Sequence, residues 1–243
     1  MTQLNWPVLA EEISRGTVRD PLQHFRPRQK RECSVCGFTG YFLSAGTRQE
    51  ARCPNCASKE RDRIIALHLR RTGLTLDDKA VLHFSAERPF FRQWRNNPSY
   101  VAGDIKKSPV ANAIVDITAL AYPENHFDLL ICNHVLEHVQ EDHKAMEECF
   151  RVLKPGGFGI FSVPLDDSRE ETWNPPPGTP PAEIARICGR THVRLYGRDF
   201  GALLAQHGFN VEIIQFTPEE AERYRLTAYM GDKVYVASKP RAN

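Results

Sequence analysis

Two periodicities alternate along most of the chain. Short apolar runs bounded by polar and turn-forming residues predict seven β-strands, at residues 80–84, 99–103, 113–116, 127–132, 158–163, 209–216 and 233–238. Apolar residues at three- and four-residue spacing predict amphipathic helices, most clearly at 146–153 and 198–207. A further helix is predicted over 58–72, with Gly73 as its C-terminal cap. This alternation indicates a Rossmann-like, doubly wound, mostly parallel seven-stranded sheet.

The pattern divides the chain into three predicted parts. Residues 1–30 predict an irregular leader with some helix near Pro7 to Ser14, residues 31–74 a small ribbon and its following helix, and residues 75–243 the Rossmann-like domain. Residues 164–191 interrupt the alternation with a proline-rich run from Trp173 to Pro181. Proline donates no hydrogen bond to a sheet and breaks helices, so a long loop is predicted, of the kind that forms a lid or a binding wall.

Four of the seven cysteines form two CxxC pairs, Cys33 with Cys36 and Cys53 with Cys56. Each pair can bring two thiolates to one metal across a tight turn, and two such turns close a tetrahedral site. We therefore expect a structural zinc ion in an N-terminal zinc ribbon. Four thiolates leave no open position, so catalysis at this metal is not expected. The other three cysteines lie in apolar surroundings and are expected in the core: Cys132, Cys149 and Cys188.

Composition narrows the class of protein without naming a partner. Hydrophobic residues make up 41% of the chain, charged residues 26%, and the net charge is +2, which is typical of a globular protein. No apolar run approaches the roughly 18 residues of a membrane span, and the first residues lack a signal-peptide core. We therefore expect a cytoplasmic protein with no membrane partner. The basic residues that close the leader are expected to form a solvated face: Arg26, Arg28, Lys30 and Arg31.

Residues 134–138 spell H-x-x-E-H, the inverted zinc-peptidase motif. On a helix, His134 and His138 would share a metal and Glu137 would act as the base. The motif, however, directly follows the buried strand predicted at 127–132, where a doubly wound sheet places a loop. The context argues against a peptidase, since short motifs often match by chance.

The same stretch has a better explanation. Residues 127–139, FDLLICNHVLEHV, and residues 151–158, RVLKPGGF, closely resemble class I S-adenosylmethionine-dependent methyltransferases of the type 11 group. The resemblance runs from about Lys79 to Ser238. With the cysteine pairs and the block from Thr191 to Phe200 included, the chain resembles a zinc-ribbon-containing bacterial subgroup of that family. It implies an enzyme that uses S-adenosyl-L-methionine.

The resemblance also implies a cofactor site. In the family, a glycine-rich loop after the first strand meets the cofactor's amino-acid part, an acid after the second strand binds the ribose, and an acid near the third faces the adenine. Here the first loop lacks those glycines, Asp104 matches the ribose acid, and Asp116 matches the adenine acid. The implied cofactor-binding residues are His83, Phe84, Ser85, Ala86, Glu87, Asp104, Asp116, Ile117, Asn133 and His134.

The acceptor is less defined. His192, Arg194 and Tyr196 follow the proline-rich loop and are expected either to bind substrate or to anchor the loop. Arg194 would hold an anionic acceptor. The candidate catalytic bases are His134, His138 and His192, because imidazole titrates near neutral pH.

We expect methyl transfer to a small-molecule or glycan acceptor, at a hydroxyl, by in-line displacement. The alternative is an RNA methyltransferase in which the ribbon and nearby arginines, including Arg61 and Arg63, bind RNA. A third possibility is a cofactor-free binding protein. The sequence leaves the oligomeric state open.

Overall fold

The computed structural model describes residues 29–45, 48–76, 78–226 and 233–241. The chain divides into two compact units. The described residues of the first fall within 29–74, 87–92 and 215–226, and those of the second within 75–86, 93–214 and 233–241. The helix predicted between Pro7 and Ser14 lies outside the described residues, as do Arg26 and Arg28.

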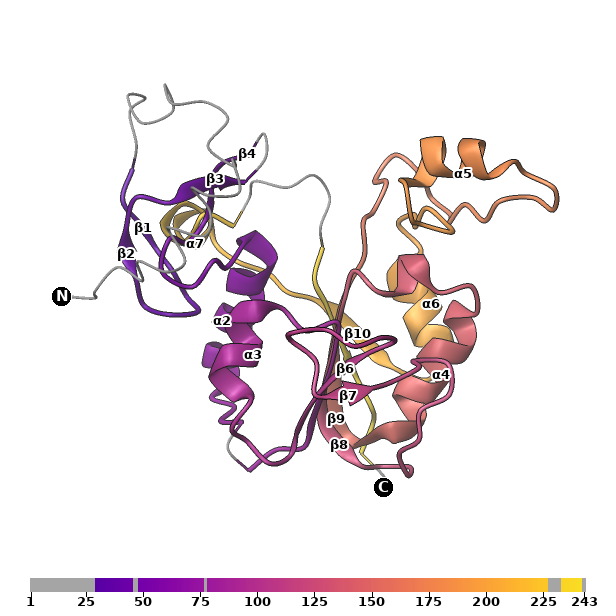
Figure 1. Cartoon of the computed structure of the whole chain (residues 1–243), viewed down its shortest axis with the longest axis horizontal. Coiled ribbons are helices and arrows are strands. Elements are labelled where there is room, and N and C mark those ends of the chain that lie inside the picture. Colours follow the sequence, from indigo (N-terminus) through magenta and orange to yellow (C-terminus); the bar gives the residue numbers. More distant parts are fainter. Residues whose placement is uncertain (1–28, 46–47, 77, 227–232, 242–243) are drawn as a thin grey trace. The chain divides into compact units, whose positions relative to one another are not determined.

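The second unit is built on the seven-stranded sheet that the sequence predicts (Figure 1). Its strands run in the order β10-β11-β9-β8-β5-β6-β7. Their bounds are β5 (Val81–Phe84), β6 (Tyr100–Asp104), β7 (Ala113–Ile114), β8 (Phe127–Asn133), β9 (Leu153–Ser162), β10 (Asn210–Ile213) and β11 (Tyr235–Ser238). Only the two pairings made by β11 are antiparallel. From β5 the chain winds outward through β6 and β7 and then crosses to β8 on the other side, which confirms the doubly wound Rossmann-like fold.

The strand β9 begins five residues before its predicted start. Leu153 pairs with Phe127, and the regular ladder resumes only where Phe158 pairs with Leu129, so the intervening residues form an irregularity in the pairing. Gly157 lies in this irregularity, and a Cβ atom there would meet the carbonyl oxygen of Asp128 at 2.9 Å. The glycine therefore permits a close backbone approach that any larger side chain would disturb.

Two amphipathic helices lie on one face of this sheet, α4 (Asp142–Val152) and α6 (Phe200–Gln206) (Figure 1). Their apolar positions, among them Met146 and Leu204, pack in the core with buried residues of the strands. Cys132, Cys149 and Cys188 are buried, as the sequence predicts. Burial raises the pKa of the Cys149 thiol, so this cysteine stays protonated and behaves as a small apolar group.

The proline-rich segment 164–191 is more ordered than the predicted long loop. It contains the helix α5 (Pro181–Cys188), which begins with proline at its first position. Isolated bridges join Leu165 to Tyr196 and Trp173 to Leu195. The prolines that exclude this segment from the sheet also start a helix, which the composition alone does not reveal.

The first unit combines two small hairpins with helices. β1 (Arg31–Glu32) pairs with β2 (Thr39–Gly40), and β3 (Leu43–Ala45) pairs with β4 (Arg48–Arg52). The helix α2 (Glu60–Thr72) follows, and Gly73 ends it in the left-handed conformation at φ 64°, as predicted. The helix α7 (Pro218–Tyr224) contacts β1, and α3 (Arg88–Trp94) begins in this unit. None of the helices in the described residues is long and apolar enough to cross a membrane.

Candidate cofactor pocket and metal sites

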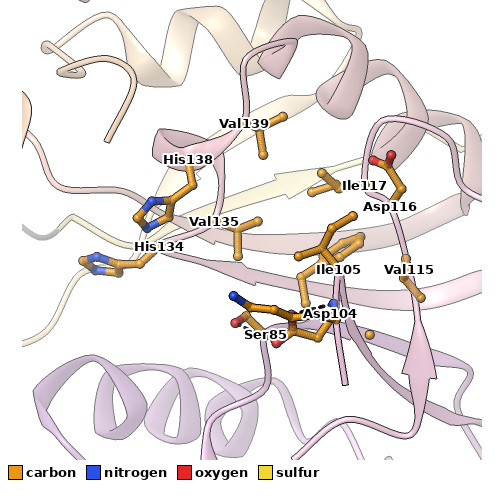
Figure 2. Close-up of a pocket in the computed structure, with 13 residues that line it drawn as sticks. Ser85, Asp104, Ile105, Val115, Asp116, Ile117, His134, Val135, His138 and Val139 are labelled. Atoms are coloured by element: carbon orange, nitrogen blue, oxygen red, sulfur yellow. Dashed lines mark hydrogen bonds between the residues drawn. The ribbon is translucent and has the colours of Figure 1, made fainter. Parts of the chain in front are cut away.

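A cavity of about 520 Å³ lies in the second unit, where the strands β5, β6 and β8 end (Figure 2). This is the point at which the strand order reverses, where doubly wound sheets bind their ligands. Its volume is within the usual range for a small-molecule site. The lining residues are Phe84, Ser85, Gly103, Asp104, Ile105, Lys106, Val115, Asp116, Ile117, His134, Val135, His138 and Val139.

Asp104 is the last residue of β6 and provides the pocket's central carboxylate. Its oxygens accept long hydrogen bonds, from the Ser85 hydroxyl at 3.4 Å and from the Lys106 backbone at 3.3 Å. Ile105 follows it and is 63% exposed, although it lines the cavity. The Asp104 carboxylate can accept further hydrogen bonds, as the hydroxyls of a ribose would require. The uncovered Ile105 side chain beside it suits the flat base attached to that ribose.

The glycine-poor loop after β5 makes its turn without glycine. Ser85 adopts the left-handed conformation at φ 49°, and its backbone N–H donates to the Gly103 carbonyl at 2.8 Å. For a residue other than glycine this conformation costs roughly 1–2 kcal/mol. The loop therefore reaches the pocket with a strained serine whose hydroxyl also contacts Asp104.

Asp116 lies on the opposite side of the cavity from His134 (Figure 2). Its oxygen Oδ1 accepts hydrogen bonds from the Thr118 hydroxyl at 2.7 Å and the Thr118 backbone at 2.8 Å. These bonds lower the pKa of the Asp116 carboxyl. The residue is exposed and shapes a turn, while its second oxygen makes no hydrogen bond to the residues that the structure describes.

The chain leaves β8 through a second left-handed residue. His134 has φ 52°, its N–H donates to the Ser162 carbonyl at 2.8 Å, and its ring nitrogen Nδ1 lies 3.3 Å from a carboxylate oxygen of Glu137. His134 and His138 both line the cavity. The H-x-x-E-H motif forms one 3₁₀ turn, Leu136–His138, instead of a longer α-helix, so the helical geometry of the peptidase motif is not present.

Six of the ten residues that the family resemblance assigns to the cofactor line this cavity: Phe84, Ser85, Asp104, Asp116, Ile117 and His134. His83 is instead fully buried in β5, with its ring 3.0 Å from the Tyr100 hydroxyl. Asn133 is also buried and accepts a hydrogen bond from Ser162. Ala86 is buried, and Glu87 lies 3.6 Å from Arg61 within the first unit.

The expected substrate residues do not line the cavity, and two of them are loop anchors. Arg194 is 5% exposed and donates to the carbonyl oxygens of Val139 at 2.7 Å and Gln140 at 2.8 Å. It also pairs with Asp142 at 2.9 Å. Tyr196 is fully buried and donates its hydroxyl to the same carboxylate at 2.7 Å. The expectation that Arg194 holds an anionic acceptor is therefore corrected, because its donors are already used inside the protein.

His192 occupies a different position. Its ring lies 4.9 Å from the ring of His138, in an edge-to-face arrangement. The ligand atoms of Glu137, His138 and His192 all lie within 4.8 Å of one another. The fold thus brings together residues 54 or more positions apart along the chain, a grouping that the H-x-x-E-H spacing does not predict.

The four cysteines of the CxxC pairs also converge, in the first unit. The sulfur atoms of Cys33 and Cys56 are 3.7 Å apart, as are those of Cys36 and Cys53. Sulfur atoms at about 2.3 Å from one tetrahedral zinc ion would be about 3.8 Å apart. The donor set and its spacing therefore fit a structural zinc ion.

Two arginines that the RNA alternative requires are not available to a partner. Arg63 is fully buried and donates to backbone carbonyls of Ala51, Ser58 and Tyr224. Burial lowers the pKa of its guanidinium. Arg31 is 7% exposed and pairs with Glu50, so the expectation of a solvated face is wrong for this residue.

Comparison with known proteins agrees with this geometry. Residues 72–161 match the model of the family described as "Methyltransferase domain". This segment is therefore similar to methyltransferase domains. A probable S-adenosylmethionine-dependent methyltransferase of Mycolicibacterium smegmatis is 28% identical over 182 residues, which cover 74% of this chain and 59% of that protein. A ubiquinone/menaquinone biosynthesis C-methyltransferase of Hydrogenovibrio crunogenus is 50% identical over 44 residues, 17% of its length. The chain therefore spans less than two thirds of the length of these relatives.

Solved structures share this fold. A 1,6-didemethyltoxoflavin-N1-methyltransferase of Burkholderia thailandensis, solved with S-adenosylhomocysteine, has a TM-score of 0.52 at 16% identity, covering 74% of this chain and 78% of that one. The [4+2]-cyclase SpnF has a TM-score of 0.51 at 22% identity, covering 97% of each chain. Because a cyclase shares the fold, the fold alone does not determine the reaction.

Sequence reasoning missed several residues of the site. Ile105, Val135 and Val139 line the cavity but look like ordinary apolar positions. Glu137 is 1% exposed within the motif, although a charged residue in a turn is usually solvated. Its neighbours His134 and His138 were the available signal, because they suggest a shared ligand.

Proposed function

We propose that this protein is an S-adenosylmethionine-dependent methyltransferase that methylates a hydroxyl group of a small-molecule or glycan acceptor. The observation that carries the proposal is the cavity at the strand-order reversal, bordered by Asp104 and Ile105. All of its lining residues fall within residues 72–161, the segment that matches the methyltransferase domain.

Asp104 would accept hydrogen bonds from the ribose hydroxyls, and Ile105 and Ile117 would cover the faces of the adenine ring. Ile105 is largely exposed, so this contact would remove apolar surface from water. When bound, S-adenosylmethionine supplies a methyl group on a good leaving group. The protein then has to orient the acceptor, exclude water and receive one proton.

His134 is the best placed of the three candidate bases. It lines the cavity, and its Nδ1 lies 3.3 Å from a carboxylate oxygen of Glu137. His138 also lines the cavity, whereas His192 does not. The burial of Arg31 and Arg63 removes two of the cations that RNA binding would use, so a small-molecule or glycan acceptor is favoured over the RNA alternative.

Calorimetry with S-adenosylhomocysteine tests the cofactor assignment. Asp104→Asn should weaken binding by about 1–3 kcal/mol, because the amide has one acceptor oxygen where the carboxylate has two. Glu124→Gln, an exposed carboxylate before β8, is the matched control and should bind like wild type. No binding by wild-type protein would refute the proposal. Methyl-labelled cofactor incubated with cell extract, with and without ribonuclease, would then separate a small acceptor from RNA.

A further inference from the structure

The cluster of Glu137, His138 and His192 has a feature that the cofactor pocket does not explain. Glu137 is 1% exposed, and neither of its carboxylate oxygens accepts a hydrogen bond from the residues that the structure describes. Two imidazole nitrogens lie close to this carboxylate: Nδ1 of His134 at 3.3 Å and Nε2 of His138 at 3.9 Å. Burying a carboxylate without donors is costly, so the site calls for a positive charge.

Hydrogen bonds hold His138 and His192 in an orientation that suits metal ligands. Nδ1 of His138 lies 2.9 Å from the Thr191 carbonyl oxygen, and Nδ1 of His192 lies 2.6 Å from the Cys188 carbonyl oxygen. A carbonyl oxygen only accepts, so each Nδ1 must carry the proton and donate it. Each Nε2 is then left with its lone pair. Metal-bound histidines are commonly fixed in this way, by a backbone carbonyl at the second ring nitrogen.

Hydrogen bonds also join the two backbone segments that carry the cluster. Val193 donates its N–H to the Glu137 carbonyl at 2.8 Å, and Arg194 donates to the carbonyls of Val139 and Gln140. Segment 191–194 therefore lies along segment 137–140, and His192 is held against His138. Arg194 forms its ion pair with Asp142 and not with Glu137.

We propose that Glu137, His138 and His192 bind a divalent transition-metal ion beside the cofactor pocket. Two imidazole nitrogens and one carboxylate favour zinc or a similar first-row ion over magnesium or calcium, which prefer oxygen ligands. The ligand atoms lie within 4.8 Å of one another, and bonds of about 2.0–2.2 Å require them to close by about an ångström. On binding, the three side chains would have to rotate toward the ion by that amount.

This ion would differ in role from the zinc expected in the ribbon. Three protein ligands leave a coordination position open, whereas four thiolates leave none. His138 borders the cavity, so a metal-bound acceptor oxygen would lie at the pocket. Coordination lowers the pKa of a hydroxyl or water and so prepares it as a nucleophile. This role rests on the proposed methyltransferase function, whereas metal binding itself does not.

Titration of the protein with zinc chloride, after the four-cysteine site has been loaded with zinc, tests the site. We expect one further zinc ion per chain, and at least about a tenfold loss of affinity in Glu137→Gln and His192→Asn. His126→Gln is the matched control, because His126 is exposed at the amino end of β8, and it should bind like wild type. Cobalt should give visible absorption without the sulfur charge-transfer band of the ribbon.

Binding of S-adenosylhomocysteine by the same samples separates the two proposals and shows that the variants are folded. Should a variant fail to fold, His138→Gln replaces it, because that side chain is 40% exposed. Normal cofactor binding without a further zinc ion, or with equal zinc affinity in wild type and variants, would overturn the metal site alone. A further zinc ion without cofactor binding would instead overturn the proposed function and leave the metal site standing.

Discussion

Replacing Arg194 distinguishes an internal anchor from an acceptor-binding residue. The sequence suggests that this arginine holds an anionic substrate, but the structure buries it to 5% exposure beneath the segment after β8. Arg194→Met keeps much of the side chain's volume and removes the guanidinium. The variant therefore tests the hydrogen bonds and the charge with little change in packing.

The expected loss of stability is large. The substitution removes donors from the carbonyls of Val139 and Gln140 and leaves the Asp142 carboxylate, 9% exposed, without its cation. Breaking a buried ion pair from one side costs about 3–5 kcal/mol. Tyr196 still donates to Asp142, so we expect a value within that range and not a larger sum. For a unit of this size, the melting temperature should fall by about 6–20 °C.

Thermal unfolding with S-adenosylhomocysteine absent is the assay, and Arg198→Met is the control. Arg198 pairs with Glu170 on the surface, where the two side chains are 49% and 85% exposed, so its loss should change stability by less than about 0.5 kcal/mol. Equal melting temperatures for Arg194→Met and wild type, together with a raised Michaelis constant for the acceptor, would refute the anchoring role. That outcome would restore the substrate role.

Two further predictions concern the first unit. Cys53→Ser should remove one tightly bound zinc ion per chain and unfold the ribbon, and metal analysis that finds the zinc content unchanged would contradict a four-cysteine site. Burial, and then the charge of Glu87, raises the pKa of Asp62 from its ordinary 3.8 to about 6. The folded state therefore holds a proton that the unfolded state releases, a stabilisation present below about pH 4 and lost as pH rises through about 6. Asp62→Asn cannot release this proton, so the melting temperature of the variant relative to wild type should rise between about pH 4.5 and about pH 7.5. A difference in melting temperature that does not change with pH would exclude the raised pKa of Asp62.

Local pattern was sufficient for most of the fold. Each of the seven strands follows from a short apolar run, and α2 follows from its periodicity and from Gly73. The helix α7 was not predicted, because only Thr217 separates it from the strand predicted at 209–216. Its place in the first unit depends on contacts with residues far earlier in the chain, such as the hydrogen bond from Arg63 to the Tyr224 carbonyl, 161 positions away.

Some residues of the site were likewise predictable from the sequence, and others were not. Asp104, Asp116 and His134 were predicted from the family resemblance, and the structure places them at the cavity where the parallel strands end. The roles of Arg194 and Glu137 were not predictable from spacing. Burial and hydrogen-bond partners decide them, and those partners come from segments that no periodicity relates.

The positions that break local rules gather around one cavity. Ser85 and His134 each adopt the left-handed conformation and line the cavity. Glu137, next to His138 at its edge, is a buried carboxylate without a hydrogen-bond donor among the described residues. Each of these features costs stability, and each persists only because its surroundings hold it in place. The bonds of Arg194 to the turn after β8 are part of that support. Such costs gathered at one place in a well-packed unit mark the cavity as the centre of function more firmly than any of these residues does alone.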